Sequence, residues 1–559
     1  MKEAIYVLDF GSQYSHLITR RIRELGVYAE LVPPNFPVKK LKNVRGVVLS
    51  GGPQNLSERN ALRVSKAIFK LGRPILGICY GMQLTAFELG GKVKAGRTRE
   101  YGPTKIRVRK SPIFRGLKPA QMTWMSHGDQ VTELPKGFEM IASSPSCQYA
   151  AMADEKRRTY GLQFHPEVIH TVNGAKILKN FLDITGAKKT WELRGFLEKT
   201  VADIKKRTGK DRVVCALSGG VDSSVAAVLV NRAVGRRLHC ILVDHGFGRL
   251  NEIEEIKSFF RVSPSPSLSH QGRGKEKRAF PSLVVPFGRS AVGMNGRGKR
   301  RVNLNLQVVD ARSEFLEALR DVTDPEQKRK IIGELFIRVF EREAKNPLLI
   351  SPSQRRGRKS GGGKIRWLVQ GTLYTDAITS GVSVGGKAAV IKSHHNVGGL
   401  PKKLGFKLIE PLRELYKDEV RKIGRLLGLP RSITERQPFP GPGLAVRIIG
   451  EITEEKLDLL READAIVREE IVKSGEDVQQ YFAVLPDIRA VGVQGDARTY
   501  GYPIIIRAVT TKDFMTAHWA KLPHDLLERL SVRITNEVPG INRVVYDITS
   551  KPPGTVEWE

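Results

Sequence analysis

A cysteine between two glycines is the first residue of this chain whose surroundings indicate chemistry. Cys79 stands in PILGICYGMQL, where an apolar stretch gives way to a helical one, with Gly77 and Gly81 two residues to either side. Glycines permit the sharp turn of a nucleophile elbow, which lifts a side chain above a sheet and points it at a helix N-terminus. That position lowers the pKa of a thiol, so the pattern favours a nucleophile over a buried structural cysteine.

The partners that a thiol nucleophile needs follow two other apolar stretches. His165 and Glu167 come just after YGLQF, two positions apart, so the carboxylate can orient the imidazole. SGGPQN at 50–55 also follows an apolar run, and its backbone amides, including that of Gly52, can form an oxyanion hole with the amide of Tyr80. Three such positions at strand ends of one parallel sheet predict a Cys-His-Glu catalytic site.

A second glycine-rich stretch, SGGVDSS at 218–224, has the composition of a phosphate-binding loop. Backbone amides, three serine hydroxyls and the dipole of a helix over 221–234 can together hold a pair of phosphates. A Walker A loop would add a lysine that reaches the β- and γ-phosphates, and here Asp222 stands where a cation is expected. The loop therefore predicts phosphate chemistry other than that of a Walker A enzyme.

The elements that must position these residues follow a regular alternation. Apolar runs that predict strands lie at 4–9, 28–32, 44–49, 74–78, 122–125 and 160–164. A second series has strands starting at 213, 238, 306 and 366 and helices over 221–234 and 325–345. From about 431 a Pro/Gly-rich stretch precedes an acidic helix and two strand-like runs. We expect an α/β chain with two tandem doubly wound parallel-sheet domains, 1–190 and 191–430, and a smaller α+β domain, 431–559.

Composition and charge restrict the class of protein further. The chain has 559 residues, 40% of them hydrophobic, and four cysteines without CxxC spacing, which disfavours a disulfide framework or a structural zinc site. Of its net charge of +35, 15 lie within 262–302 and 345–366. These Ser-, Gly- and Arg-rich stretches look like inserts, near 262–302 and 346–365. Without a signal peptide or a membrane-spanning apolar run, a cytoplasmic location is expected.

The stretches around Cys79, His165 and SGGPQN closely resemble the class I glutamine amidotransferases. The resemblance implies that Cys79 attacks the side-chain amide of glutamine, that His165 passes a proton to the departing ammonia, and that water releases glutamate. It also implies that Gln83 helps to bind glutamine. Such a site supplies ammonia, and the ammonia needs an acceptor.

The loop at 218–224 matches the PP-loop of the ATP pyrophosphatases, which release the β- and γ-phosphates of ATP together as pyrophosphate. This resemblance implies attack at the α-phosphorus, a magnesium ion favoured by Asp222, and a phosphate contact from Lys392. The implied ATP-binding residues are Ser218, Gly219, Gly220, Val221, Asp222, Ser223, Ser224 and Lys392.

Further motifs resemble one family of amidotransferases, the glutamine-hydrolysing GMP synthetases. They are QGTLYTDAI, KSHHNVGGLP, RQPFPGPGLAVRI, AVGVQGDARTYGYP and KPPGTVEWE. The resemblance implies an enzyme that uses XMP, Mg²⁺-ATP and glutamine: O2 of XMP attacks the α-phosphorus, and ammonia then displaces AMP to give GMP. It also implies XMP contacts from Arg249, Asp496, Lys551 and Glu557 and a homodimer formed through 431–559. Gly248 departs from the larger apolar residue of many relatives.

Three alternatives remain open at this stage. The charge of +35 would suit a nucleic-acid-binding protein, although aromatic-interleaved basic motifs are missing and no specific nucleic-acid partner is expected. A different PP-loop amidotransferase would make NAD or asparagine. The inserts could also have inactivated a chain whose motifs are intact.

Overall fold

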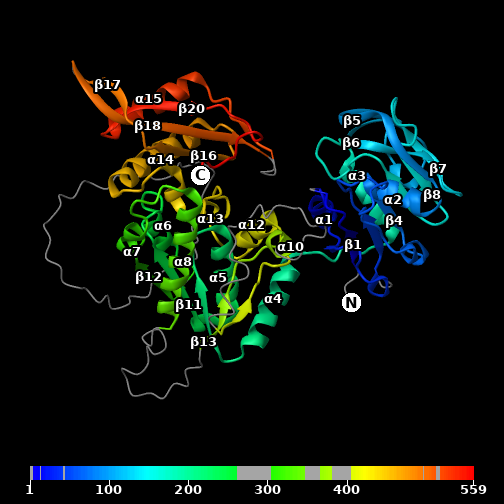
Figure 1. The fold of residues 1–559 in the computed structure, drawn as a ribbon. Helices are drawn as coiled ribbons and strands as arrows, with labels where there is room; N and C mark the ends of the chain where they lie inside the picture. Colours follow the sequence, from blue (N-terminus) through cyan, green and yellow to red (C-terminus); the bar gives the residue numbers. More distant parts are fainter. Residues whose placement is uncertain are drawn as a thin grey trace, which may run out of the picture. The chain divides into compact units, whose positions relative to one another are not determined.

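The computed structural model describes residues 4–12, 14–41, 44–260, 302, 304–345, 365–379, 405–494, 496–511 and 516–559. The chain folds into two compact units, one that ends at Phe196 and one that begins at Leu197. In Figure 1 the first unit is blue and cyan, and the second runs from green to red. Lys392 and nearly all of both inserts lie outside the described residues.

The first unit is built on a nine-stranded sheet in the order β2-β1-β3-β4-β9-β8-β7-β5-β6. Five strands are parallel: β2 (Ala29–Val32), β1 (Ile5–Leu8), β3 (Gly46–Leu49), β4 (Ile75–Ile78) and β9 (Thr159–Leu162). Nearly all of their side chains are buried. Parallel strands covered on both faces read as continuous apolar runs, and the sequence therefore predicts all five. The helices of this unit are α1 (Ser15–Glu24), α2 (Tyr80–Glu88) and α3 (Gly174–Thr185).

The other four strands of this sheet are antiparallel, and the sequence predicts only part of one of them. They are β8 (Ala151–Asp154), β7 (Glu139–Ser143), β5 (Lys92–Val108) and β6 (Ala120–Glu133). β5 reads KVKAGRTREYGPTKIRV, which has neither an apolar run nor a regular alternation of apolar and polar residues. Its pairing with β6 is also shifted between Ala95 and Glu100. A strand of this kind is specified by its partner and gives little local signal.

The second unit contains a five-stranded sheet in the order β12-β11-β10-β13-β14, and all of its strands are parallel. The strands are β12 (Leu306–Asp310), β11 (Leu238–Asp244), β10 (Arg212–Ala216), β13 (Ile365–Val369) and β14 (Lys407–Ile409). The predicted strands at 213, 238, 306 and 366 are all present. So is the helix α5 (Val221–Val234), with both ends as predicted.

Seven other helices accompany this sheet among the described residues. They are α4 (Leu193–Thr208), α6 (Glu252–Phe259), α7 (Arg312–Ala318), α8 (Pro325–Ala344), α10 (Tyr374–Thr379), α12 (Lys417–Leu426) and α13 (Arg431–Thr434). The predicted amphipathic helix at 325–345 corresponds to α8. It begins at Pro325 and is capped by Asp324, whose side chain accepts a hydrogen bond from the Gln327 amide (2.8 Å).

The last part of the chain forms a sheet of its own. Its strands are β15 (Ile448–Ile449), β16 (Gln480–Pro486), β17 (Ala490–Gln494), β18 (Ala497–Thr510), β19 (His518–Trp519) and β20 (Ile541–Asp547). The long helices α14 (Glu454–Ser474) and α15 (His524–Glu537) pack on this sheet and on each other. One hydrophobic cluster joins this sheet to α8 and β11, so a boundary near 430 is not visible as a break in the core.

The mixed α/β fold with parallel-sheet domains is confirmed. No helix among the described residues is long and apolar enough to cross a membrane.

Candidate active sites

Cys79 occupies a strained turn between β4 and α2. Its backbone has φ 53° and ψ −109°, a region that residues with side chains rarely adopt. The flanking glycines are required by space: a Cβ on Gly81 would lie 2.2 Å from the Leu49 carbonyl oxygen, and one on Gly77 would lie 2.5 Å from that of Gly81. The GxCxG pattern therefore has the steric cause that a nucleophile elbow predicts.

His165 and Glu167 form a buried pair just past the end of β9. Nδ1 of His165 donates to Glu167 Oε1 at 2.7 Å, which leaves Nε2 available to a thiol. Burial alone would lower the pKa of His165, but the Glu167 carboxylate and the Cys79 sulfur outweigh burial and raise that pKa to about 10. Arg21 fixes the backbone of Glu167 by donating to its carbonyl oxygen (3.1 Å). The Glu167 carboxylate therefore favours the protonated imidazole of His165 next to the Cys79 sulfur.

The loop after β3 closes against the same residues. A Cβ on Gly51 would lie 3.2 Å from His165 Cε1, and one on Gly52 would lie 3.4 Å from the Tyr80 ring and 2.8 Å from the Phe10 carbonyl oxygen. The structure thus brings Gly52 and Tyr80, the two predicted oxyanion-hole residues, next to each other. The Tyr80 hydroxyl donates to the Leu62 carbonyl (2.7 Å), which fixes the ring.

Gln83 and a residue that the sequence did not single out, Gln163, lie against the thiol. Gln163 Nε2 donates to Cys79 Sγ (3.8 Å), and Gln83 Nε2 donates to Gln163 Oε1 (3.3 Å). The Cys79 thiol itself faces the Ser126 carbonyl oxygen at 3.6 Å. Gln163 stands two residues before His165, and this spacing along a strand end is the signal that would have identified it.

The loop 218–224 lies at the carboxyl end of β10, which is the strand where the order of the second sheet reverses. Ligands of open α/β sheets bind at such a point. The Ser218 and Ser223 hydroxyls lie 2.9 Å apart, and Ser223 also donates to the Gly220 carbonyl (3.2 Å). Gly219 has φ +73°, and a Cβ there would lie 2.2 Å from Ile256 Cδ1. A side chain at this position would force the Ile256 side chain of α6 to move.

Asp222, in the first turn of α5, is paired with a lysine that the sequence did not indicate. Lys417 Nζ lies 2.7 Å and 2.6 Å from the two carboxylate oxygens of Asp222. The buried hydroxyl of Ser224 has no hydrogen-bond partner among the described residues, and neither has that of Thr372. A carboxylate and hydroxyls are the oxygen donors that Mg²⁺ prefers, so this donor set fits the metal.

Two predicted XMP contacts, Arg249 and Glu557, belong to one cluster of charges. Arg249 is buried, its Nε and Nη2 have no hydrogen-bond partner among the described residues, and its guanidinium lies 4.3 Å from the centre of the Phe439 ring. Burial lowers its pKa to about 10. Arg447 donates to both Glu557 oxygens (3.0 and 2.9 Å) and lies 3.6 Å from Asp464, whose other oxygen is 3.9 Å from Arg249.

The other two predicted XMP contacts are placed differently. Asp496 is exposed in the turn between β17 and β18, with a left-handed φ of 60°, and the structure does not bring it to the Arg249 cluster. Lys551 exchanges backbone hydrogen bonds with Ala517 (2.8 and 3.1 Å). The fully buried Arg507 donates to three carbonyls of the last segment, those of Thr549, Thr555 and Val556. The C-terminal segment is therefore docked rather than frayed.

Arg436 connects the loop 218–224 to the backbone of Arg249 through Glu252. Its Nη1 donates to the Gly219 carbonyl (3.1 Å), and its Nη2 forms a short ion pair with Glu252 Oε1. The other Glu252 oxygen accepts from the backbone N–H of Arg249 (2.8 Å). A Cβ on Gly248 would approach this oxygen to 3.2 Å, so a larger residue there would press on Glu252.

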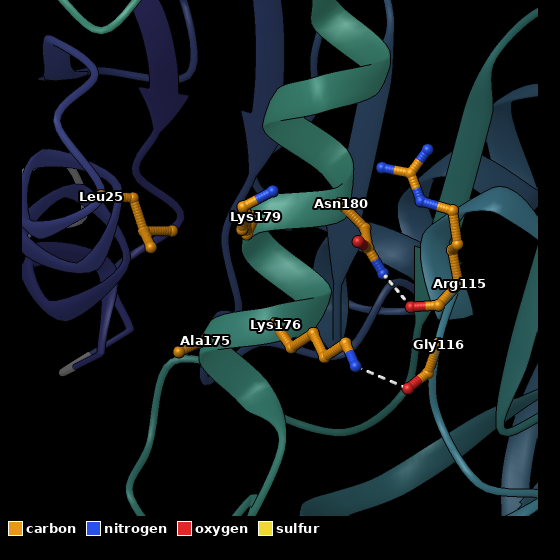
Figure 2. Close-up of a pocket in the computed structure, with 7 residues that line it drawn as sticks. All are labelled: Leu25, Arg115, Gly116, Ala175, Lys176, Lys179 and Asn180. Atoms are coloured by element: carbon orange, nitrogen blue, oxygen red, sulfur yellow. Dashed lines mark hydrogen bonds between the residues drawn. The ribbon is translucent and has the colours of Figure 1, made fainter.

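A pocket of about 500 Å³ in the first unit contains none of the predicted site residues. Figure 2 shows it beside α3, with the Asn180 and Lys176 side chains donating to the carbonyls of Arg115 and Gly116. It is lined by Leu25, Arg115, Gly116, Ala175, Lys176, Lys179 and Asn180. Arg115 and Lys179 both pair with Asp183 at 2.9 Å, so one carboxylate neutralises part of the positive charge of the lining.

Comparison with known proteins identifies the class of the chain. Residues 6–184 match the family model described as Glutamine amidotransferase class-I. Residues 192–259 match the model described as NAD synthase, and residues 469–558 match GMP synthase C terminal domain. The chain therefore combines a class I glutamine amidotransferase segment with segments similar to NAD synthase and to the C-terminal domain of GMP synthase.

Relatives of full length identify the family. The chain is 52% identical over 564 residues to the GMP synthase [glutamine-hydrolyzing] of Geobacillus kaustophilus, with all of both chains covered. It is 52% identical to that of Caldicellulosiruptor saccharolyticus and 49% identical to that of Clostridium tetani, covering 99% and 100% of those chains. The chain belongs to the glutamine-hydrolysing GMP synthase family, as the sequence motifs predict.

Proposed function

We propose that the chain makes GMP from XMP, ATP and glutamine and divides the work between two sites. Glutamine is hydrolysed around Cys79, and XMP is adenylated and aminated around the loop 218–224. What carries the proposal is the presence, in one chain of this family, of a Cys-His-Glu site on a strained elbow and a phosphate loop without a Walker lysine.

In the glutaminase site, the Cys79 thiolate attacks the amide carbon of glutamine, and the backbone amides of Gly52 and Tyr80 stabilise the oxyanion. His165, held by Glu167, donates the proton with which ammonia leaves as the carbon–nitrogen bond breaks. Water then hydrolyses the thioester and releases glutamate. Gln83 binds the substrate beside the thiol.

In the synthetase site, the amides and hydroxyls of 218–224 hold the β- and γ-phosphates at the start of α5, where the helix dipole favours negative charge. O2 of XMP attacks the α-phosphorus, pyrophosphate leaves, and ammonia then displaces AMP at C2. A magnesium ion bound with ATP would neutralise phosphate charge, and Asp222 would face it. Lys417 supplies further positive charge beside the loop. Lys392, which lies outside the described residues, is assigned a phosphate contact from the resemblance of its motif alone.

XMP binding is assigned to Arg249, Asp496, Lys551 and Glu557. The buried Nε and Nη2 of Arg249, which lack a hydrogen-bond partner among the described residues, support this role, because buried guanidinium donors suit an anionic ligand. We assign residues 1–190 to an amidotransferase domain and 191–430 to an ATP pyrophosphatase domain, each doubly wound. Residues 431–559 form a dimerisation and XMP-binding domain, in keeping with the exposed Val491, Val493 and Tyr500 on β17 and β18. A cytoplasmic location belongs to the same proposal.

One assay tests the function as a whole. Full-length protein is incubated with XMP, Mg²⁺-ATP and glutamine, and the products are separated by ion-exchange chromatography. We expect GMP, AMP, pyrophosphate and glutamate in equal amounts. Replacing XMP with deamido-NAD or aspartate tests the alternative amidotransferases, and amination of either instead of XMP would overturn the assignment. Release of ADP and phosphate would overturn the role of the loop.

A further inference from the structure

A line of buried hydrogen bonds leads from Cys79 into the antiparallel half of the first unit. Gln163 bonds to the thiol, and Gln83 Nε2 donates both to Gln163 Oε1 (3.3 Å) and to the Asp129 carbonyl oxygen (2.7 Å). With both of its amide hydrogens engaged, Gln83 can offer a bound glutamine only an acceptor, Oε1. The orientation of this amide therefore depends on where the Asp129 carbonyl lies.

The Asp129 carbonyl is held by a histidine that the mechanism does not use. His127 Nδ1 donates to it at 3.0 Å, and His127 Nε2 lies 2.9 Å from Glu100 Oε2. Glu100 and His127 are directly opposite each other on the paired strands β5 and β6. Because a carbonyl oxygen can only accept, Nδ1 must carry its hydrogen, and the pair needs one further proton between Nε2 and the carboxylate.

Glu100 is also held in place by hydrogen bonds from residues 144–146, which belong to neither β5 nor β6. Its Oε1 accepts hydrogen bonds from the hydroxyls of Ser144 (3.1 Å) and Ser146, and Ser144 Oγ in turn accepts from the Cys147 amide (2.9 Å). Glu100 and His127 are both buried, at 8% and 6% exposure. A buried carboxylate with donors on both oxygens has one orientation, and so has the imidazole that it contacts.

We propose that Glu100 and His127 are positioning residues of the glutaminase site. They hold β6 from Ser126 to Asp129, whose first carbonyl faces the Cys79 thiol (3.6 Å) and whose last carbonyl orients Gln83. The pair thereby determines that Gln83 presents an acceptor to glutamine. This inference rests on the proposed function and adds to it a determinant of the affinity for glutamine.

A metal ion is the competing explanation for the same cluster. Glu100, His127 and Cys147 each offer a ligand atom, and these atoms lie within 4.8 Å of one another. The 2.9 Å between His127 and Glu100 is a hydrogen-bond length, and burial together with Glu100 raises the pKa of the Cys147 thiol to about 12, which keeps it protonated. Both observations favour a direct hydrogen bond between His127 and Glu100 over a metal ion shared by the cluster.

The test separates glutamine affinity from folding. In the full-length enzyme, His127→Ala should raise the KM for glutamine about tenfold and leave GMP formation from ammonium salts within twofold of the parent. His127→Asn keeps an N–H near the Nδ1 position and should stay within about threefold of the parent KM. His127→Gln reaches Glu100 but not the Asp129 carbonyl, and should resemble His127→Ala.

Asn180→Ala is the matched control, because Asn180 is equally buried in the same unit and also donates to backbone carbonyls, those of Ile113 and Arg115. An equal rise in KM for this control would reduce His127 to a merely structural residue and overturn the inference. So would an unchanged KM in His127→Gln, or one equivalent of zinc retained through purification and lost in Cys147→Ala. A parent without glutamine-dependent GMP formation would instead overturn the proposed function.

Discussion

Lys417 Nζ contacts both carboxylate oxygens of Asp222, at 2.7 Å and 2.6 Å, although 195 residues separate the two in sequence. Lys417 opens α12 and Asp222 lies in the first turn of α5, and these helices pack against each other. The carboxylate expected to face magnesium is therefore neutralised by a cation of the protein. Because both side chains are partly exposed, the pair is weak enough for Mg²⁺-ATP to compete with it.

Asp222→Ala should reduce XMP-dependent pyrophosphate release by about a hundredfold or more and leave basal glutamine hydrolysis measurable. The substitution removes the acidic oxygens from the loop and leaves Lys417 without its partner. The measurement is a coupled assay for pyrophosphate beside an assay for glutamate. Asp203→Ala is the matched control, since Asp203 also pairs with a basic residue, Arg207, but on α4. Equal loss in both variants would contradict a specific role.

Cys79→Ala should abolish glutamine-dependent GMP formation and leave the ammonia-dependent reaction within about twofold, because the thiolate is needed only to liberate ammonia. Both reactions are followed by the appearance of GMP. Iodoacetamide at neutral pH should likewise modify Cys79 and spare Cys147, whose thiol pKa burial raises to about 12. Equal loss with both nitrogen donors would contradict the assignment of two sites.

The pH dependence of glutamine hydrolysis should reflect the His165–Glu167 pair. A histidine whose folded pKa is raised to about 10 stabilises the folded state fully below its unfolded value near 6.5, and this contribution is lost as the pH rises toward 10. We expect kcat/KM for glutamine to decline on an alkaline limb near pH 10. Glu167→Gln should move that limb to lower pH, because burial then acts without the carboxylate. An unmoved limb would contradict the pairing.

The sequence predicts those elements whose conformation is determined by residues next to them in the chain. The parallel strands are apolar runs because both of their faces are buried, and the ends of α5 follow from the glycines before it and after it. Cys79 is recognisable because space forces glycine at positions 77 and 81. In each case neighbouring residues carry the constraint, and a single sequence shows it.

Contacts between residues far apart in the chain leave no comparable signal in a single sequence. The sequence assigns no individual role to Lys417 or Arg436, and only the packing of α12 and α13 against α5 brings them to the loop 218–224. The role inferred for His127 likewise depends on its register with Glu100 across β5 and β6. β5 itself was not predicted, since its mixed polar residues follow no regular alternation.

The two basic inserts provide the last prediction. Deleting residues 263–301, or 347–364, with short Gly/Ser replacements should leave GMP synthesis close to that of the full chain. The first insert leads from α6 into β12, and the second leads from α8 into β13. Since all strands of this sheet are parallel, loops that enter strands lie at the edge opposite the loop 218–224.

The ends of the first insert support a clean deletion. Phe260 and Val302 pair in a parallel bridge, so the two ends of the insert lie side by side and the replacement linker has a short distance to span. Each doubling of the length of a flexible loop raises the free-energy cost of closing that loop by only about 0.6 kcal/mol. The fold can therefore tolerate the inserts even if they have no function. Removing most of their net charge of +15 should also weaken salt-dependent binding of nucleic acid, measured by filter binding. If either soluble, trimmed enzyme loses XMP-dependent pyrophosphate release, that insert reaches the catalytic edge and the topological argument fails.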